Sequence, residues 1–488
     1  MNPWVVRAPA EVPPFAEAFA RVRDEFGIPA TFPEAVEAEA AAVERRGPVT
    51  PPGAPAGERR DARDIPFVTI DPPGSMDLDQ AFHAERRAGG FRVRYAIADV
   101  AAFVTPGGEL DVEAFVRGVT LYLPDGRAPL MPTTIGQGCA SLLPDQERPA
   151  LLWTIDLDET GATTAARLER ATVRSRAQLS YADVQDAVDA GRAEESLTLL
   201  RTIGTLRLQR QGERGGLSLD LPSQEVVPAA GGGFTLVYDA PLPVEGWNAQ
   251  ISLLAGMEAA TIMVRGGVGI LRTVPPPDPV QLGRLRRAAT ALDVPWPERS
   301  RWSDVVRGLD RTDPQDAAFL IQAAHTLRGA GYATLDATNT SDPATVPVHA
   351  GIAAAYAHVT APLRRLADRH ANEIVLALCE GAEPPGWARD ALDRLVETME
   401  ATTRLEAGVE RAVVDAVECA VLAGHVGERF DAVVIDESRR GVTVQLKGVA
   451  IVAALAADIP LGERVAVVVT GVDPVARHVL LAPAASTS

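Results

Sequence analysis

The period of the apolar residues changes along this chain, and that change limits the folds the chain can adopt. Between residues 60 and about 175, β-rich runs such as PFVTID, FRVRYAIADV and LLWTIDLD alternate with Gly, Pro and Asp, which is typical of strands and turns. Helical spacing becomes more frequent from about residue 180, and residues 388–424 are almost entirely helical by this measure. Alternating strand patterns return over residues 426–488. We therefore expect a mixed α/β domain followed by a small closed β-barrel, most simply an OB-fold.

A Pro- and Gly-rich stretch, GPVTPPGAPAG at residues 47–57, separates an N-terminal part from the rest, because it cannot continue a helix. Before it, two short segments with helical spacing flank Gly27 and Pro29, an arrangement that resembles a helix-turn-helix. Glutamates on the second segment would repel phosphate, so a packing or regulatory module is the better interpretation; they are Glu34, Glu37, Glu39 and Glu44. The expected domains are a helical N-terminal domain with its linker at 1–58, the mixed α/β domain at 59–425 and the OB-fold at 426–488.

Composition narrows the chemistry further. The 488 residues carry a formal net charge of −18, which argues against a basic surface that coats nucleic acid. A local positive channel beside an acidic metal centre stays compatible with this charge. The three cysteines are far apart in the chain, so we expect neither a disulfide framework nor a cysteine-rich zinc site. Since no apolar stretch is long enough to span a bilayer and residues 1–14 lack the pattern of a signal peptide, we expect a soluble, cytoplasmic protein with no membrane partner.

The segment TIDPPGSMDLDQAF concentrates acidic residues at the end of an expected strand. Asp71 follows the apolar residues and precedes a Pro-Pro-Gly turn. Asp77 and Asp79 lie two residues apart, which places both side chains on one face of an extended backbone. Three carboxylates that meet at one point repel each other unless a hard cation such as Mg²⁺ neutralises them. The segment predicts a metal site, although taken alone it also fits an exposed acidic turn.

The segment YAHVTAPLRRLADRHANEIVLAL predicts a helix with an arginine at its start. Thr360 suits the N-cap position, and Pro362 suits the first helical turn. Arg364 then lies where its guanidinium and the helix N–H groups can face the same anion. Taken alone, this segment would be better explained by an ordinary surface ion pair between Arg364 and Asp368.

Four segments in this order resemble the catalytic RNB domain of the ribonuclease II family: TIDPPGSMDLDQAF, YAIADVAAFV, RGVTLYLPDGRAPLMP and TAPLRRLAD. The expected C-terminal barrel resembles the RNA-binding OB module that ends those enzymes. The resemblance extends from about residue 60 to the C-terminus, and four ordered motifs are far more specific than any one of them. It implies a mixed α+β RNB catalytic domain and a processive 3′→5′ exoribonuclease that uses Mg²⁺ to hydrolyse single-stranded RNA to nucleoside 5′-monophosphates.

The resemblance also implies roles for individual residues. The metal-binding positions fall on Asp71, Asp77, Asp79 and Gln80. The catalytic positions fall on Asp79, which would position or deprotonate the attacking water, and Arg364, which would stabilise charge on the phosphate. The RNA-binding positions fall on Tyr122, Tyr181, Arg365 and Thr360, where stacking on a tyrosine would hold the 3′ end without reading its sequence.

Four features depart from the family pattern, one of which is Leu219, where the family has an aromatic residue after the GG pair at 215–216. Gln80 replaces the fourth family aspartate; it keeps a carbonyl oxygen but removes one negative charge. Ala249 and Gln250 stand where the family has an acidic pair credited with ribose recognition. The first 58 residues are also too few for the two cold-shock barrels common in the family.

These departures keep two alternatives open. The first is a catalytically impaired RNA-binding protein that retains the RNB fold. The second is an unrelated metal-dependent phosphatase or hydrolase, which would leave the Tyr122 motif and the barrel unexplained. Single-stranded RNA is the expected partner in the leading interpretation, and a monomer is expected by analogy with channel enzymes.

Overall fold

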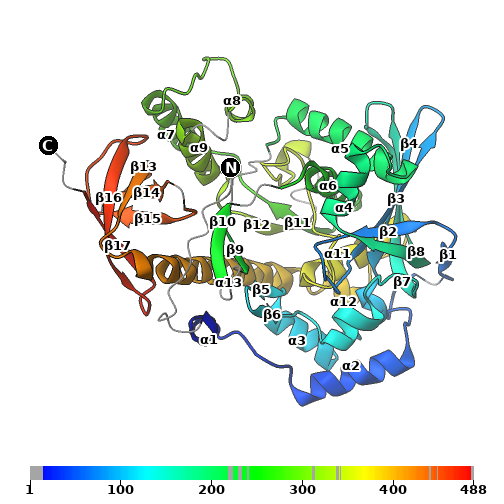
Figure 1. Cartoon of the computed structure of the whole chain (residues 1–488). Helices are drawn as coiled ribbons and strands as arrows, with labels where there is room; N and C mark the ends of the chain where they lie inside the picture. The colour runs from blue at the N-terminus through cyan, green and yellow to red at the C-terminus, as the bar shows by residue number, and fades with distance from the viewer. Residues whose placement is uncertain are drawn as a thin grey trace.

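The computed structural model describes residues 15–55, 57–217, 224–228, 234–238, 241–309, 314–336, 340, 342–438, 441–447 and 449–484. Residues 1–14, on which the signal-peptide prediction rests, lie outside these ranges, and so does Leu219, at which the sequence departs from the family pattern. The described chain has a layered α/β body at one end and a β-barrel at the other, with a long helix running between them (Figure 1).

The main sheet contains six strands in the order β1-β8-β2-β3-β4-β7. These strands are β1 (Arg60–Asp61), β2 (Phe67–Ile70), β3 (Gln80–Arg87), β4 (Gly90–Ala98), β7 (Glu147–Asp158) and β8 (Thr163–Leu179). With 17 residues, β8 is long enough to pair parallel with β1 and β2 and antiparallel with β7, so the sheet closes on itself. All four residues of β2 are buried, as the continuous run in PFVTID suggests. The strand-rich organisation predicted for this part of the chain is confirmed.

Helices pack around this sheet. They are α3 (Glu109–Arg117), α4 (Tyr181–Asp189), α5 (Glu195–Arg214), α6 (Pro243–Gly266), α11 (Leu366–Cys379) and α12 (Gly386–Arg389). Helix α5 packs against β3 and α6, while α11 packs against β8 and α6. The short helical turns are η1 (Val100–Ala102), the π-helix η2 (Ile135–Cys139), η3 (His325–Leu327), η4 (Pro343–Thr345) and η5 (Ala423–His425).

Buried charges on α11 are paired with residues of neighbouring elements. Arg170 on β8 donates to Glu373 on α11 at 2.6 Å and to Asp99 at the same distance. Arg369 on α11 donates to Asp111 on α3. Since breaking a buried ion pair costs about 3–5 kcal/mol, these contacts hold α11 firmly against β8 and α3.

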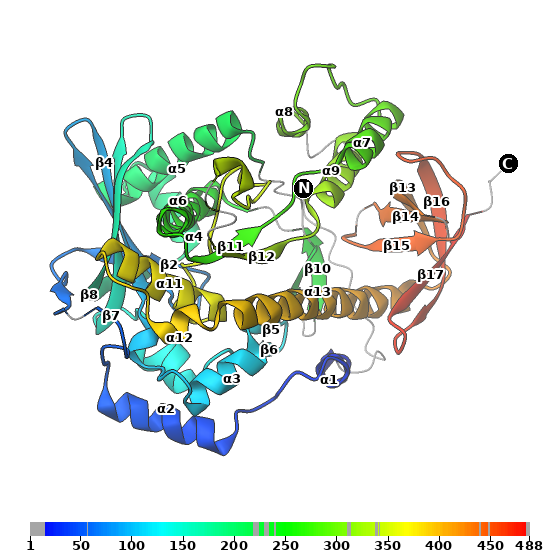
Figure 2. The same ribbon diagram turned by 180° about the vertical axis from the view of Figure 1, so that it is seen from behind.

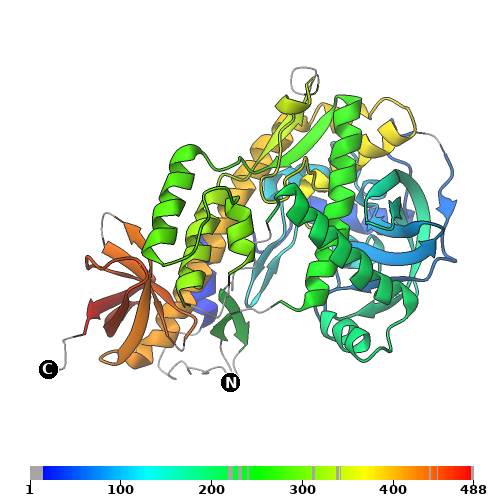
Figure 3. The same ribbon diagram turned by 90° about the horizontal axis from the view of Figure 1, so that it is seen from above.

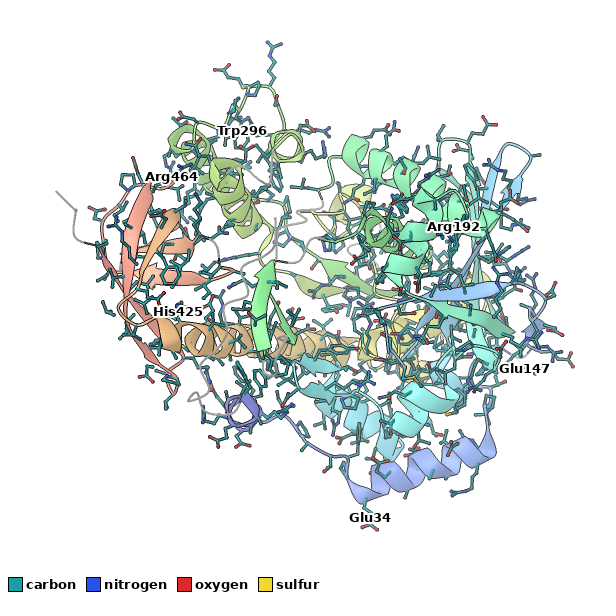
Figure 4. The ribbon with its side chains drawn as sticks, in the orientation of Figure 1. Glu34, Glu147, Arg192, Trp296, His425 and Arg464 are labelled. Carbon is teal, nitrogen blue, oxygen red and sulfur yellow. The ribbon has the colours of Figure 1, made fainter. Side chains whose placement is uncertain are left out.

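Three two-stranded sheets and a group of helices lie between the main sheet and the barrel. The sheets pair β5 (Leu121–Leu123) with β6 (Gly126–Ala128), β9 (Gln224–Pro228) with β10 (Phe234–Tyr238), and β11 (Gly269–Thr273) with β12 (Gly331–Leu335). The helices are α7 (Pro279–Ala291), α8 (Trp302–Arg307) and α9 (Pro314–Ala324). These helices lie beside the barrel (Figure 3) and form a second apolar core. The ring of Trp296, labelled in Figure 4, packs in it against Phe319.

A helix of 31 residues, α13 (Leu392–Leu422), connects the α/β body to the barrel (Figure 2). At 1.5 Å per residue it is about 45 Å long. The barrel is closed, with strands β13 (Arg429–Ser438), β14 (Gly441–Leu446), β15 (Val452–Leu455), β17 (His478–Pro483) and β16 (Arg464–Asp473) in that order. Its five strands fit the predicted OB-fold. None of the helices in the described ranges is both long enough and apolar enough to span a bilayer.

The two N-terminal helices pack on different parts of the molecule. Helix α1 (Phe15–Glu25) lies against α13, whereas α2 (Glu34–Arg46) lies against α3 and η2, well away from α1 (Figure 1). This arrangement differs from the compact helix-turn-helix that the sequence resembles. Of the four glutamates on α2, Glu34 projects into solvent, while Glu39 accepts the backbone N–H of Leu110 at the start of α3 (Figure 4). Glu39 therefore has a packing role between α2 and α3, as expected for this segment.

The junction between α13 and the barrel contains a buried glutamate. Glu418 is 5% exposed, and its Oε1 accepts the backbone N–H of Val452 at 2.9 Å and the side-chain amide of Gln224 at 2.7 Å. Burial raises the pKa of Glu418 to about 7. Because the folded state holds this proton more tightly than the unfolded chain, the group's contribution to stability is full below pH 4.5 and is lost as the pH rises through about 7.

Replacement of Glu418 by Gln should therefore flatten the pH dependence of stability. The Gln carbonyl can accept both hydrogen bonds, and it carries no charge to bury. We expect Glu418→Gln to be more stable than the wild type above about pH 7, by up to about 3 kcal/mol, and to lose that advantage near pH 4.5. Urea unfolding across this pH range measures the difference, with Glu397→Gln, exposed on the same helix, as the matched control. A constant difference between wild type and Glu418→Gln would contradict this account.

Candidate active site

The acidic segment folds into a turn at the end of β2 and opens onto a cavity of about 450 Å³. The backbone N–H of Asp71 continues the pairing of β2 with β8 by donating to the carbonyl of Leu179 at 3.0 Å. Gly74, with φ of 82°, allows the chain to reverse before β3 begins at Gln80. The side chains that line the cavity belong to Asp71, Pro72, Pro73, Ser75, Asp77, Asp79, Gln80, Tyr122, Arg127, Tyr181 and Arg364, together with Gly74. The segment therefore forms one wall of a cavity, with Asp79 buried at its end and Pro72, Pro73, Gly74 and Met76 exposed to solvent.

Two of the three carboxylates are strongly desolvated. Asp79 is 4% exposed, and burial raises its pKa to about 7, opposed by the nearby Arg364 guanidinium. Burial likewise raises the pKa of Asp71 to about 6. The Oδ2 atom of Asp71 is buried and has no hydrogen-bond donor among the described residues. Both groups would be stabilised in their charged form by a cation in the cavity.

Asp77 already has two partners, and both lie on the β5–β6 hairpin. Arg127 Nη1 donates to Oδ1 of Asp77 at 2.6 Å, and the Tyr122 hydroxyl donates to Oδ2 at 3.0 Å. Tyr122 is nevertheless 54% exposed, so its ring is accessible from the cavity. Tyr181 starts α4 directly after the capping residue Ser180 and lines the same cavity. The structure thus brings both predicted tyrosines to the acidic turn.

Arg127 is a site residue that the sequence interpretation missed. It is the cross-strand partner of Tyr122 in the β5–β6 pair. The Pro-Asp-Gly stretch in LYLPDGRAP indicates a hairpin but not its register. The structure places Pro124 and Asp125 in the turn and pairs Leu123 with Gly126, which sets Arg127 opposite Tyr122.

Arg364 reaches the site from a turn, because its helix starts later than predicted. Helix α11 begins at Leu366 with Arg365 at the N-cap position, so Thr360 is not the N-cap. The chain before it folds back through hydrogen bonds from the N–H groups of Arg364 and Arg365 to the carbonyl of Ala361. The physical reason is Asp368, whose Oδ1 accepts the N–H of Ala361 and holds this turn in place.

The ion pairs of this turn exclude the surface pair considered for the sequence alone. Arg364 Nε lies 3.3 Å from Oδ2 of Asp79, and Asp368 is paired instead with Arg365. The anion that faces the turn is therefore the carboxylate of Asp79, whose Oδ1 also accepts the N–H of Leu363 at 2.8 Å. The Arg364 side chain stays 45% exposed toward the cavity.

Arg365 and Thr360, expected to bind RNA, are occupied by contacts within the protein. Arg365 makes two hydrogen bonds to Asp368, at 2.9 and 3.0 Å. Thr360 is buried, and its carbonyl accepts the side-chain amide of Gln80 at 2.6 Å. Neither residue lines the cavity. Their assignment to RNA binding stays a prediction.

The structure shows what surrounds Gln80, Ala249 and Gln250, which differ from the family pattern. Gln80 accepts the hydroxyl of Tyr95 on its Oε1 at 2.7 Å, in addition to its contact with Thr360. Ala249 on α6 is exposed, while Gln250 is 4% exposed and donates to Oε1 of Gln211 at 2.7 Å. Gln250 is thus directed into the protein core.

The donor set of the cavity suits a hard divalent cation. Carboxylate oxygens are the ligands that Mg²⁺ prefers, and the buried Oδ2 of Asp71 lacks a partner. Within the described ranges, no three Asp, Glu, His or Cys side chains are arranged to hold a metal ion together as the structure stands. Asp77 is turned to Arg127 and Tyr122 in this arrangement. Asp71 has a carboxylate oxygen without a partner that could bind a cation. Asp79 and Asp77 have suitable chemistry, and their oxygens contact protein donors in this structure.

Comparison with known proteins agrees with this geometry. The RNB domain matches residues 59–381, and the RNase II-type exonuclease C-terminal S1 domain matches residues 428–484. Ribonuclease R of Vibrio parahaemolyticus is 26% identical over 479 residues, which cover 90% of this chain and 55% of that protein. Ribonuclease R of Escherichia coli is 26% identical over 447 residues, with coverage of 86% and 53%. The chain spans about half the length of these relatives.

Solved structures share the fold. Mycoplasma genitalium RNase R in complex with ribose-methylated single-stranded RNA gives a TM-score of 0.85 at 19% identity, over 96% of this chain and 78% of that chain. A yeast pseudonuclease gives a TM-score of 0.69 at 17% identity, over 87% and 54%. Since the RNB match covers more than half of the residues, in a chain with an acidic cavity, an adjoining arginine and a terminal five-stranded barrel, the protein belongs to the RNB-domain family of the ribonuclease II type.

Proposed function

We propose that this chain is a Mg²⁺-dependent exoribonuclease that degrades single-stranded RNA processively from the 3′ end to nucleoside 5′-monophosphates. The observation that carries the proposal is one cavity lined by three carboxylates, an exposed arginine and two tyrosines: Asp71, Asp77, Asp79, Arg364, Tyr122 and Tyr181. Acids and an arginine suit phosphodiester hydrolysis, and tyrosine rings suit unstacked bases. Relatives named Ribonuclease R support the reaction class.

In this proposal, different side chains of the cavity have different roles in the reaction. A cation bound by Asp71, Asp77 and Asp79 would supply a Lewis acid for the phosphate and lower the pKa of a bound water. Leu363 N–H fixes one oxygen of Asp79, which leaves Oδ2, beside Arg364, to orient the attacking water. Arg364 would donate to the phosphate oxygens as negative charge grows on them. Tyr122 and Tyr181 would hold the terminal bases by stacking.

The expected partner is single-stranded RNA. Solved structures of Mycoplasma genitalium RNase R contain ribose-methylated single-stranded RNA in one case and double-stranded RNA in another, which supports RNA as the ligand class. We propose a monomer, because one chain supplies all the residues of the cavity. We also propose a cytoplasmic location and no membrane partner.

A second function is favoured by one observation. Gln80 stands at the position of a family aspartate, and the fold is also found in a yeast pseudonuclease. The alternative is an RNA-binding protein that retains the fold and has little or no activity. The presence of Asp71, Asp77, Asp79 and Arg364 in one cavity favours the enzyme.

A time course on single-stranded RNA of about thirty nucleotides, labelled at its 5′ end, tests the proposal. With Mg²⁺, we expect the full-length band to be replaced by one short labelled fragment without a ladder of intermediates, and with EDTA we expect no cleavage, because the carboxylates need a cation. A ladder would contradict processivity. RNA that stays intact with Mg²⁺ but shifts in a native gel would instead support the RNA-binding alternative.

Replacement of Asp79 by Asn separates chemistry from binding. The Asn carbonyl can still accept the N–H of Leu363, but the charge is gone. We expect kcat to fall by at least about a hundredfold, since groups that hold a metal ion contribute several kcal/mol to transition-state stabilisation. RNA affinity in a gel-shift assay should stay within a few-fold of the wild type. Asp156→Asn, on the far end of the sheet in a surface ion pair with Arg92, serves as the control and should leave kcat unchanged.

A further inference from the structure

A chain of hydrogen bonds runs behind the acidic turn and ends on the backbone that carries Arg364. The side chain of Gln80 donates through Nε2 to the carbonyl of Thr360 at 2.6 Å. Its Oε1 accepts the Tyr95 hydroxyl at 2.7 Å, and that hydroxyl lies 2.7 Å from Oγ of Ser252. The chain therefore joins strands β3 and β4, helix α6 and the turn before α11.

The chemistry of the partners fixes the orientation of the Gln80 amide. A carbonyl oxygen only accepts hydrogen bonds, so the amide nitrogen must face Thr360. The amide oxygen then faces Tyr95 and accepts its hydroxyl hydrogen. Because a hydroxyl has only one hydrogen, Ser252 must be the donor in its contact with Tyr95. Every group in the chain has a partner, and Tyr95 is only 1% exposed. Gln80 and Ser252 are half-buried, so the network is anchored at the buried Tyr95 and Thr360 and restrains the Gln80 amide between them.

The turn that receives this contact is short. Gln80 holds it at the carbonyl of Thr360, and Asp79 holds it at the N–H of Leu363. Thr120 N–H donates to the carbonyl of Arg364 from the β5 side. The Arg364 side chain is the exposed part of an otherwise fixed backbone. The direction of the Arg364 side chain therefore depends on these three contacts together with the contact of Asp368 to the N–H of Ala361.

We infer that Gln80 is a positioning residue, whose amide fixes the Thr360–Arg364 turn and so aims the Arg364 guanidinium, and that it is not a ligand of the metal ion. This inference rests on the proposed function. An aspartate at this position has no donor for the Thr360 carbonyl and is one methylene shorter. A glutamine there gives up one negative charge at the cavity and gains a direct hold on the arginine turn.

Alanine and glutamate at position 80 separate the two roles. Gln80→Ala removes both hydrogen bonds; we expect kcat to fall about 10- to 100-fold, because a small displacement of a charge-stabilising group is that costly, while KM changes little. Calorimetric titration of Mg²⁺ into the metal-free protein should give a dissociation constant close to that of the wild type, whereas loss of a ligand would clearly weaken Mg²⁺ binding.

Gln80→Glu tests the same point in the opposite direction. A glutamate can accept from Tyr95, but its second oxygen repels the carbonyl of Thr360. A positioning role predicts that kcat falls as it does for Gln80→Ala. A ligand role predicts that kcat is kept or rises, because a carboxylate binds Mg²⁺ better than an amide. Retained kcat in Gln80→Glu together with weakened Mg²⁺ binding in Gln80→Ala would overturn the inference.

Variants behind the site complete the test. Tyr95→Phe keeps the ring but frees the Gln80 amide, and we expect kcat to fall about fivefold. Unchanged kcat in Tyr95→Phe would overturn the role of the network. Gln322→Ala is the matched control, since this glutamine also holds a backbone carbonyl, that of Ile435, and lies in the α9–barrel contact; its kcat should equal that of the wild type. Circular dichroism and thermal unfolding confirm that each variant is folded.

The wild type, measured first, distinguishes the two proposals. No Mg²⁺-dependent hydrolysis by the folded wild type would overturn the proposed function and the positioning role with it. An active wild type with an equally active Gln80→Ala would overturn only the positioning role.

Discussion

The site depends on a contact between two turns that are far apart in the sequence. Asp79 accepts the N–H of Leu363 across a separation of 284 residues, and the neighbouring Gln80 holds Thr360 across 280 residues. Each bond alone is worth about 1 kcal/mol, or somewhat more where the acceptor is charged. Their importance lies in geometry, because they join the acidic turn after β2 to the arginine turn before α11. The carboxylates and the Arg364 guanidinium face the same cavity only if the turn after β2 and the turn before α11 are both fixed in place.

The elements are held by buried charges that the apolar core makes expensive to separate. Arg170 links β8 to Glu373 on α11, and Arg365 and Asp368 tie the arginine turn to the first turn of the same helix. Partners of this kind seldom add net stability when they form, but loss of one leaves an unpaired charge in a low-dielectric environment. A strand and a helix joined in this way cannot slide relative to each other. The position of Arg364 is therefore set by the same network that fixes α11 in the core.

The order of domains can be predicted from the sequence, because the spacing of apolar residues and the positions of Gly and Pro are local properties of the chain. The strands before residue 175, the long helix and the terminal barrel all follow from apolar spacing, and the residues of the acidic turn were identified together with Tyr122, Tyr181 and Arg364. The start of α11 was not predicted, because Thr360 and Pro362 have good local propensities, which the contact between Asp368 and Ala361 overrides. The partners of Gln80 were also beyond reach, since Tyr95, Ser252 and Thr360 come from three distant segments.

The β5–β6 hairpin is held against the acidic turn by contacts from two sides. Two strands of three residues each are marginal by themselves, so the hairpin depends on outside contacts for its position. Asp77 supplies two of them, through Tyr122 and Arg127.

Arg23 on α1 supplies another contact at the hairpin turn, through Asp125, and Glu25 on the same helix pairs with Arg477 of the barrel. Exposed pairs of this kind contribute at most about 1 kcal/mol each, so they guide the hairpin without locking it. The Asp77 carboxylate therefore fixes where the Tyr122 ring lies relative to the acidic turn.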